Sequence, residues 1–358
     1  MAAQPIPVQP VPEPRTRKKL LQRAPRDYSQ KLRRSFQAAF LLLNLWIGYR
    51  FVQFVHFYES GAQGVAPARP AGVEGWLPIA ALMNLKATLL TWKLPEVHPA
   101  GLFLLLAFLG MSLLLKKSFC GWLCPVGTVS EYLWQIGRKL FRRNFRIHTW
   151  VDIPLRSLKY ILLALFLYAV GSMPVEGIRA FLGGPYGVVA DVKMLNFFRF
   201  LSTFAAWTIA ILVVLSVFVQ NFWCRYLCPY GALMGLAALF SPTRIRRDAG
   251  RCIDCSKCAK ACPSSLPVDK LVTIRSAECT ACMECVAVCP ADGALQLSVI
   301  FPAPTPARHI PAWAMAASIA VIFFGLVGFA KATGHWSAEI PSWVYSDLVP
   351  HASEYKHP

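Results

Sequence analysis

Charged residues and nucleotide-binding motifs are scarce in this sequence. Only 15% of its 358 residues are charged, whereas 56% are hydrophobic and the mean hydropathy is +0.45. This composition is typical of an integral membrane protein with a modest polar part. The sequence has no phosphate-cradling glycine loop, nucleophile elbow or dinucleotide fingerprint, so it shows no sign of the chemistries that depend on them.

Histidine is also missing from the places where a haem inside the bilayer would need it. None of the seven histidines lies at the centre of a clear apolar run. His56 and His98 are expected near the outer surface, where a quinone or haem pairing competes with the common occurrence of interfacial histidines. Arg50 lies within an apolar run and is either an interfacial anchor or a quinone-site residue. Three further charged residues fit surface loops: Lys86, Asp191 and Lys193.

Acidic residues are few, with 18 Asp and Glu against 37 Lys and Arg, and the net charge is +19. We do not take this surplus as a sign of nucleic-acid binding, because basic residues of membrane proteins usually report orientation. Of the 37, 28 lie in three segments: 15–34, 116–159 and 225–308. The positive-inside rule places these segments in the cytoplasm. The outer side would receive segments without cysteine: 58–99, 173–196 and the tail after 331.

Apolar runs predict five membrane spans, at 36–57, 101–115, 155–170, 197–219 and 313–330. A sixth run, 76–92, contains Lys86 and is either a further span or a re-entrant or interfacial helix. The predicted organisation has four parts. These are a proline-rich, then basic, cytoplasmic N-terminus (1–34), a transmembrane domain (35–240), a ferredoxin domain (241–302), and a last span with a short periplasmic tail (303–358).

The N-terminal apolar run follows Arg33-Arg34-Ser35-Phe36, which looks like a twin-arginine export signal. The run is long, however, contains Arg50 and is followed by four more predicted spans. We therefore interpret it as an uncleaved signal anchor. Residues 1–14 contain five prolines and are expected to be a disordered leader.

Two four-cysteine runs of the form C-x2-C-x2-C-x3-C-P follow one another near the C-terminal end, and each is the bacterial ferredoxin signature. In such pairs the fourth cysteine of each run binds the cluster of the other run. The predicted ligands of the first [4Fe–4S] cluster are Cys252, Cys255, Cys258 and Cys289. Those of the second are Cys279, Cys282, Cys285 and Cys262. Structural zinc and disulfides are the alternatives.

The other four cysteines form a duplicated phrase, aromatic-Cys-x-aromatic-Leu-Cys-Pro-x-Gly, at residues 119–127 and 223–231. Each copy ends a predicted span and opens a helical stretch, at 128–141 and 232–240. If the copies are structural repeats, they should meet, with the two sulfurs of each copy on one helix face. The resulting candidate site consists of Cys120, Cys124, Cys224 and Cys228. It could hold iron, a third iron–sulfur centre or Cu(I), form a reversible disulfide, or contain only packed thiols.

The two C-x3-C-P phrases followed by two ferredoxin runs resemble the polytopic membrane ferredoxins, a family that includes NapH, the membrane half of NosR and the oxidase-assembly protein CcoG. The resemblance covers roughly residues 35–330. It implies an electron carrier of the cytoplasmic membrane, linked to quinol oxidation or to a partner reductase. No flavin-binding domain precedes the first span as in NosR. About 28 residues follow the last span, too few for CcoG's additional domain, so NapH-like proteins are the expected nearest relatives.

The predicted fold is an all-α membrane domain of five or six helices with an internal repeat and an inserted small α+β ferredoxin domain. Its strands are expected at 244–247, 272–274 and 295–299. The predicted function is electron relay between the quinone pool or a membrane partner and a reductase or ferredoxin-like protein of a respiratory chain. The chain would be a carrier subunit in contact with lipid, with quinol oxidation as a candidate activity. The alternative is a CcoG-like metal-handling protein that reduces copper at the C-x3-C-P cysteines.

Overall fold

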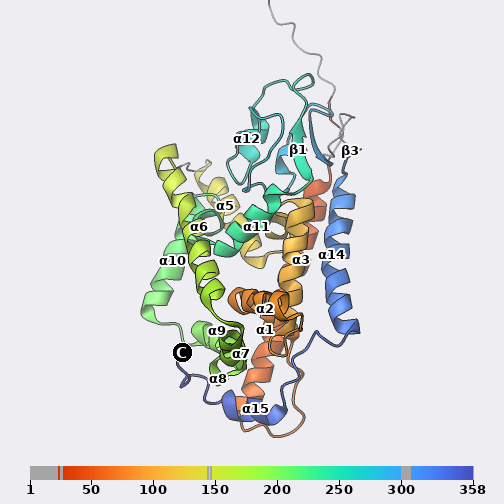
Figure 1. Ribbon diagram of the computed structural model, residues 1–358. Coiled ribbons are helices and arrows are strands. Elements are labelled where there is room, and N and C mark those ends of the chain that lie inside the picture. Colours follow the sequence, from red (N-terminus) through yellow and green to blue (C-terminus); the bar gives the residue numbers. More distant parts are fainter. Residues whose placement is uncertain (1–22, 25–26, 143–144, 146, 300–307, 358) are drawn as a thin grey trace, which may run out of the picture.

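The structure, a computed structural model, describes residues 23–24, 27–142, 145, 147–299 and 308–357. The leader predicted at residues 1–14 and the domain boundary predicted at 302 lie outside these residues. Long helices run through the middle of the molecule, with a part that contains the strands at one end and short helices at the other (Figure 1).

The helical part is built around α3, which packs against α2, α11 and α14. Helix α3 is apolar along its whole length, and most of its residues are buried within the protein. Helix α1 packs against α5 and α14, and α10 packs against α5. The bounds of the longer helices are α1 Ser29–Glu59, α2 Pro78–Thr91, α3 Pro99–Leu115, α5 Pro125–Phe141, α6 Thr149–Ser172, α10 Thr203–Phe218, α11 Pro229–Leu239 and α14 Ala312–Ala332.

Three helices of the described residues are long and apolar enough to cross a membrane: α1, α6 and α14. Helices α9 (Ala190–Arg199) and α10 would make a fourth span as a pair, but the chain bends by 81° between them. Helix α3 has 17 residues and is thus ~25 Å long, shorter than a bilayer core of ~30 Å. The chain is therefore a helical membrane protein, and the count of five or six spans stays a prediction.

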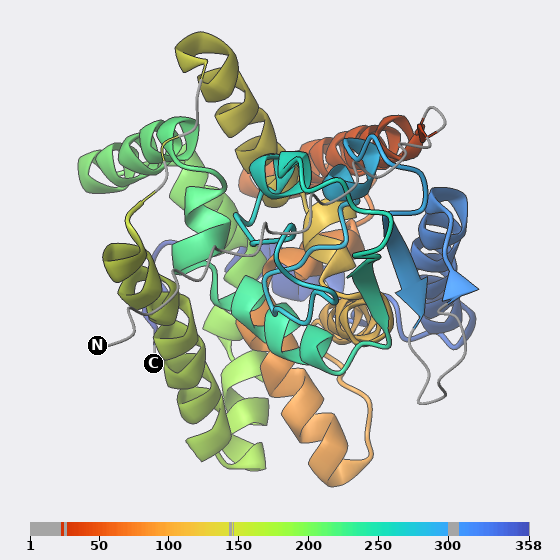
Figure 2. The ribbon, with the colours of Figure 1, turned by 90° about the horizontal axis from the view of Figure 1, so that it is seen from above.

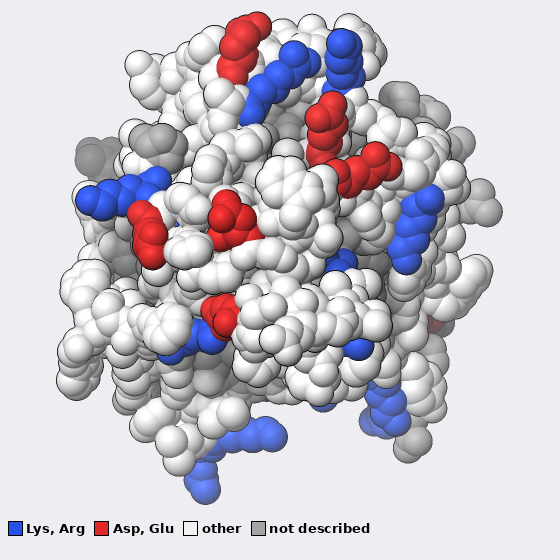
Figure 3. Space-filling view, turned by 90° about the horizontal axis from the view of Figure 1, so that it is seen from below, with Lys and Arg blue, Asp and Glu red and all other residues white. Residues whose placement is uncertain are grey.

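The short helices lie together at one end. They are η1 (Ala71–Trp76), α7 (Val175–Gly183), α8 (Pro185–Val188), α9 and α15 (Ser342–Leu348). Most of them lie around the C-terminal part of α1, and α7 lies against α2. Phe54 and Val55 of α1 form an apolar cluster with Val189 and Tyr345. These segments are the loops and tail predicted to share one side of the membrane, and they lie at the end opposite the strands (Figure 1). On this face basic and acidic side chains are scattered over a mostly uncharged surface (Figure 3).

The three strands form an antiparallel sheet of order β1-β2-β3, with bounds β1 Thr243–Arg247, β2 Leu295–Val299 and β3 Arg308–His309. Buried Ile245 and Leu297 face each other across β1 and β2. The predicted strands at 244–247 and 295–299 are confirmed. The strand predicted at 272–274 is wrong, because the chain makes one bridge there, at Thr273, and then leaves toward the second cysteine run. Each cysteine run contains one short helix that includes its third cysteine, α12 (Lys257–Ala261) in the first and α13 (Glu284–Ala287) in the second.

Candidate iron–sulfur centres

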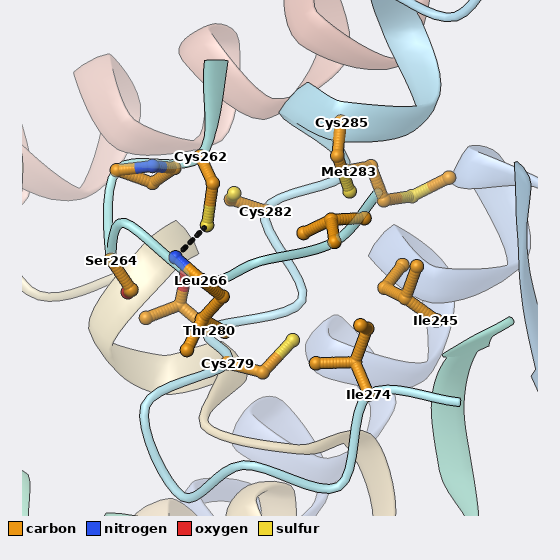
Figure 4. Close-up of a pocket in the computed structure, with 12 residues that line it drawn as sticks. Ile245, Cys262, Ser264, Leu266, Ile274, Cys279, Thr280, Cys282, Met283 and Cys285 are labelled. Atoms are coloured by element: carbon orange, nitrogen blue, oxygen red, sulfur yellow. Dashed lines mark hydrogen bonds between the residues drawn. The ribbon is translucent and has the colours of Figure 1, made fainter. Parts of the chain in front are cut away.

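One cavity, which we call the inner cavity, is lined by four cysteines from both ferredoxin runs: Cys262, Cys279, Cys282 and Cys285. All four are buried. Their sulfur atoms point toward a common space that is otherwise lined mostly by apolar side chains, including those of Ile245, Leu266 and Ile274 (Figure 4). The backbone N–H of Leu266 donates to Sγ of Cys262 over 3.4 Å. Such a dry, thiol-lined space with N–H donors suits a cluster, whose charge hydrogen bonds to sulfur help to balance.

A second cavity, the distal cavity, is lined by the other four ferredoxin cysteines: Cys252, Cys255, Cys258 and Cys289. Ile253, Ala294 and Leu295 complete its apolar wall. Here only Cys258 is buried, and Cys255 is exposed. The fourth cysteine of each run thus lines the cavity of the other run, which is the grouping that the motif predicts. Ligation of a cluster by either set stays a prediction.

The alternatives to clusters fit this geometry less well. Among the described residues, no three His, Cys, Asp or Glu side chains come together as a site for one metal ion. Structural zinc needs four ligands on a single centre. The thiolates of a cubane instead bind different irons around a cavity. All twelve cysteines are free thiols in the structure, so it contains no disulfide framework.

The four remaining cysteines, which we call the cysteine quartet, lie at the ends of two short helices. Cys120 belongs to α4 (Ser118–Trp122) and Cys224 to the π-helix η2 (Trp223–Leu227). Cys124 and Cys228 are the N-cap residues of α5 and α11. The expectation that each pair shares one helix face is therefore wrong. The prolines that follow Cys124 and Cys228 begin new helices, because proline favours the first helical position and keeps the residue before it out of the helical conformation.

The four cysteines of the quartet are partly buried, and each affects the pKa of its neighbours. Burial, together with negative charge on Cys228, raises the pKa of Cys120 to about 12 and that of Cys124 to about 11. Gly127 N–H donates to Sγ of Cys124 over 3.4 Å and Gly231 N–H to Sγ of Cys228 over 3.2 Å. The glycine of each phrase thus supplies an equivalent N–H···S bond, so the two copies are repeated in geometry as well as in sequence.

A buried lysine lies between the quartet and the inner cavity. Lys117 is 4% exposed, and its Nζ is 3.6 Å from a carboxylate oxygen of Glu278. Burial alone would lower the pKa of Lys117, but Glu278 and the cysteines Cys120, Cys228 and Cys224 raise it. Glu278 also accepts a hydrogen bond from Lys159 over 2.6 Å. Burial opposes ionisation of Glu278, yet the two lysines lower its pKa to about 2. Glu278 immediately precedes Cys279 of the inner cavity. Lys117 and Glu278 therefore connect the quartet with that cavity.

Both copies of the duplicated phrase contact the loops of the inner cavity. Trp122, which is fully buried, donates its indole N–H to the carbonyl of Ala281 over 3.1 Å. A Cβ on Gly121 would lie 2.9 Å from the carbonyl oxygen of Thr280, so only glycine permits this approach. From the second copy, Arg225 donates to the carbonyl of Ser264 over 2.8 Å. Seen from the ferredoxin end, these loops lie over the middle of the helices (Figure 2).

Arg33 of α1 joins three parts of the chain. Its guanidinium is 1% exposed and donates to Glu131 of α5 at 2.5 Å and to Glu284 of α13 at 2.9 Å. One turn earlier, Gln30 donates to the carbonyl of Cys282 over 2.9 Å. Arg34, by contrast, is exposed. Arg33 is therefore an interior residue of the folded protein, and this position favours the interpretation of the N-terminal helix as an uncleaved anchor.

At the opposite end, four ionisable side chains form a buried network that the sequence did not predict. Arg69 donates to Asp191 over 2.7 Å and to Glu74 over 2.7 Å. Nδ1 of His98 is 3.5 Å from Glu74, and its Nε2 is 2.8 Å from the carbonyl oxygen of Gly187. Burial opposes protonation of His98, but Glu74 and Asp191 raise its pKa. Both ring nitrogens of His98 have protein partners, so neither is free for a haem iron.

Other residues that the sequence singled out have ordinary structural roles. The surface loop predicted for Asp191 is wrong, because the side chain is 1% exposed. Lys86 lies in α2 and donates to the last carbonyls of α6, including that of Gly171 over 2.7 Å, where a cation is favourable. Lys193 donates to the carbonyl of Ala352 over 2.6 Å. His56 is exposed, and Arg50 lies over the ring of Trp46.

Two family models match the chain. A model described as "4Fe-4S binding domain" matches residues 97–147 and 201–247, which contain the cysteine quartet. A model described as "4Fe-4S dicluster domain" matches residues 244–290, which contain both ferredoxin runs. No solved structure matches the chain.

One curated relative covers most of the chain, and two others cover about half of it. "Putative electron transport protein YccM" of Escherichia coli is 48% identical over 91% of this chain and 91% of its own length. "Regulatory protein NosR" of Pseudomonas aeruginosa is 37% identical over 48% of this chain, which spans 24% of that protein. "Ferredoxin-type protein NapH" of Haemophilus influenzae is 30% identical over 52% of this chain and 60% of its own length. The chain therefore belongs to the family of 4Fe–4S ferredoxin-type membrane proteins that includes YccM, NosR and NapH.

Proposed function

We propose that this protein is a membrane-bound iron–sulfur electron carrier that connects a membrane-phase redox partner with a soluble one. The observation that carries the proposal is the grouping of the eight ferredoxin cysteines into two cavities with four thiols each. A [4Fe–4S] cluster, when bound, accepts and releases one electron. Cys262, Cys279, Cys282 and Cys285 would hold one cluster, and Cys252, Cys255, Cys258 and Cys289 the other.

The residues around these cavities support a route from the helices to the ferredoxin part. The inner cavity receives contacts from both duplicated phrases, through Trp122 and Arg225. Lys117 and Glu278 lie between this cavity and the quartet. Because all inner-cavity cysteines are buried and Cys255 is exposed, we place the inner cavity on the membrane side of the route and the distal cavity on the soluble side.

The ferredoxin part would face the cytoplasm, as an insertion at residues 241–302 between the membrane helices. The positive-inside rule supports this orientation, since 28 of the 37 Lys and Arg lie in segments on that side. On the opposite face basic side chains are mixed with acidic ones (Figure 3). The bacterial inner membrane is the proposed location, with five or six spans. The membrane-phase partner would be the quinone pool of a respiratory chain, which the family resemblance implies.

For the quartet we propose a third iron–sulfur centre. Four partly buried thiols from two equivalent phrases, two N–H···S bonds and the buried Lys117 suit a group that carries negative charge. A single Cu(I), as a metal-handling protein would need, fits less well, because no three of these cysteines come together as a site for one ion. Electron transfer is therefore favoured over metal handling.

The iron content tests this proposal. Protein purified without oxygen is expected to contain more than about eight irons per chain, since two cubanes supply eight. Replacement of Cys120, Cys124, Cys224 and Cys228 by serine should return the count to about eight, with acid-labile sulfide falling in parallel. About eight irons in both proteins would contradict the third centre. A count well below eight in the wild-type protein would contradict the two cubanes.

A further inference from the structure

The distal cavity opens toward a surface with unpaired positive charge. Cys255 is exposed, and Cys252 and Cys289 are partly exposed, whereas the four cysteines of the inner cavity are between 7% and 9% exposed. Since electron transfer falls off with distance, the distal site is the one that a soluble carrier can approach. In Figure 1 this part, marked by α12, lies at the end of the molecule farthest from α15.

Four exposed basic residues lie on the segments that line this cavity or next to them, and we call them the distal rim: Arg23, Lys257, Lys260 and Lys270. Lys257 lies between Ser256 and Cys258 of the cavity wall, and Lys270 follows Asp269, another wall residue. Arg23 is placed here because its strand-like bridge to Ala291 brings it beside the cavity. Within the described residues, none of the four makes an ion pair.

Two acidic residues of the same surface lie beside arginines. Asp248 is 3.6 Å from Arg251, and Asp254 is 3.5 Å from Arg247. Asp269, which accepts a hydrogen bond from Ser256 over 2.8 Å, and the exposed Asp292 keep their negative charges, but the four cations of the rim outnumber them. The charge presented at the rim is therefore net positive. Charged rims of this kind steer partners of opposite charge and fix their orientation, while redox encounters bury little surface and stay transient.

We propose that the distal rim is the docking surface for a small acidic one-electron carrier protein, such as a flavodoxin or an acidic ferredoxin. This inference rests on the proposed function, because it takes the distal cavity to be a cluster site. One electron passes between the docked carrier and that site, so one is oxidised and the other reduced by a single electron, and no bond forms or breaks. The surface lies at the end of the ferredoxin part away from the helices, which favours a soluble protein over lipid headgroups.

The test uses full-length protein with its clusters, in nanodiscs of uncharged lipid, and an acidic flavodoxin as the probe. The rim variant carries Lys257→Gln, Lys260→Gln and Lys270→Gln. The control carries Lys31→Gln, Arg34→Gln and Lys139→Gln, which remove the same charge from exposed positions on the helical part. Binding of oxidised flavodoxin is measured by calorimetry, and cluster reduction by reduced flavodoxin is followed in a stopped-flow experiment.

The rim variant is expected to bind flavodoxin roughly fivefold to fiftyfold more weakly at low salt, because three exposed charge pairs are lost. The control should change binding less than about twofold. At 1 M salt the rim variant and the wild-type protein should bind flavodoxin equally, since the Debye length is then only ~3 Å and exposed charges are screened. The reduction rate should fall in parallel. If the triple variant loses its clusters, Lys260→Gln alone should show a smaller shift of the same sign.

Three outcomes would overturn the proposal. These are equal weakening in rim and control variants, tighter binding of a basic cytochrome c than of flavodoxin, and flavodoxin binding that occurs only after deletion of residues 2–22. The last result would assign the surface to the chain's own N-terminal segment. Reduction of the clusters by dithionite, which needs no docked protein, distinguishes failure of this proposal from failure of the proposed function. Clusters that dithionite reduces normally leave the carrier function standing, whereas absent clusters would refute that function.

Discussion

Replacement of Arg33 by methionine is expected to destabilise the protein by about 3–5 kcal/mol, the cost of breaking a buried ion pair by removing one partner. The side chain is 1% exposed and its removal leaves Glu131 and Glu284 without their shared cation. Because Glu284 precedes Cys285, the loops of the inner cavity should loosen as well. The free energy of unfolding in mixed micelles and the iron content measure the two effects.

Arg34→Met is the matched control, because Arg34 is the neighbouring residue and is exposed. It should change the free energy of unfolding by no more than about 0.5 kcal/mol. Arg33→Lys should be intermediate, since lysine keeps the charge but cannot bind two carboxylates with a planar fork. Equal effects of Arg33→Met and Arg34→Met on membrane insertion, without a difference in stability, would instead support a twin-arginine signal.

Asp191→Ala is expected to destabilise the opposite end of the molecule by a similar amount, about 3–5 kcal/mol. Asp191 is 1% exposed and is bound by two nitrogens of Arg69, at 3.0 and 2.7 Å. Without it, Arg69 and a protonated His98 would share only Glu74 as a counter-ion. The loss should appear in the free energy of unfolding, whereas the iron content of the folded fraction should stay unchanged, because the network lies far from both cavities (Figure 1).

Glu59→Ala serves as its control. Glu59 also pairs with an arginine, Arg199, but the two side chains are 26% and 34% exposed. Exposed pairs contribute about 0.2–1 kcal/mol, so this variant should be nearly neutral. If Glu59→Ala lowered the free energy of unfolding as much as Asp191→Ala, the buried network would contribute no more to stability than an exposed ion pair. Loss of iron from folded Asp191→Ala protein would contradict its separation from the cluster sites.

The features that the sequence predicted well depend on short-range patterns. The ferredoxin runs fix the local loops, and apolar runs mark α1, α6 and α14 as membrane helices. The segments that flank the cysteine runs placed β1 and β2 correctly. In each case the signal lies within a few residues or one continuous segment, so composition and spacing are enough.

The features that the sequence missed depend on contacts between distant segments. Asp191 and Arg69 are 122 positions apart in the chain, and nothing local distinguishes this aspartate from one in a surface loop. The sequence shows Arg33 only as part of a motif that looks like a twin-arginine signal, because its carboxylate partners lie 98 and 251 positions away. The role of Gly121 likewise depends on Thr280, which approaches it only in the folded protein.

The most direct test of the two-cluster account compares two double variants by their loss of iron. Cys252→Ala with Cys289→Ala removes two thiols of the distal cavity, whereas Cys252→Ala with Cys262→Ala removes one thiol from each cavity. The first pair should therefore lose about four irons relative to the wild-type protein and the second about eight. The reverse order, or equal losses in both variants, would contradict the crossed arrangement of the cysteines and with it the proposed route.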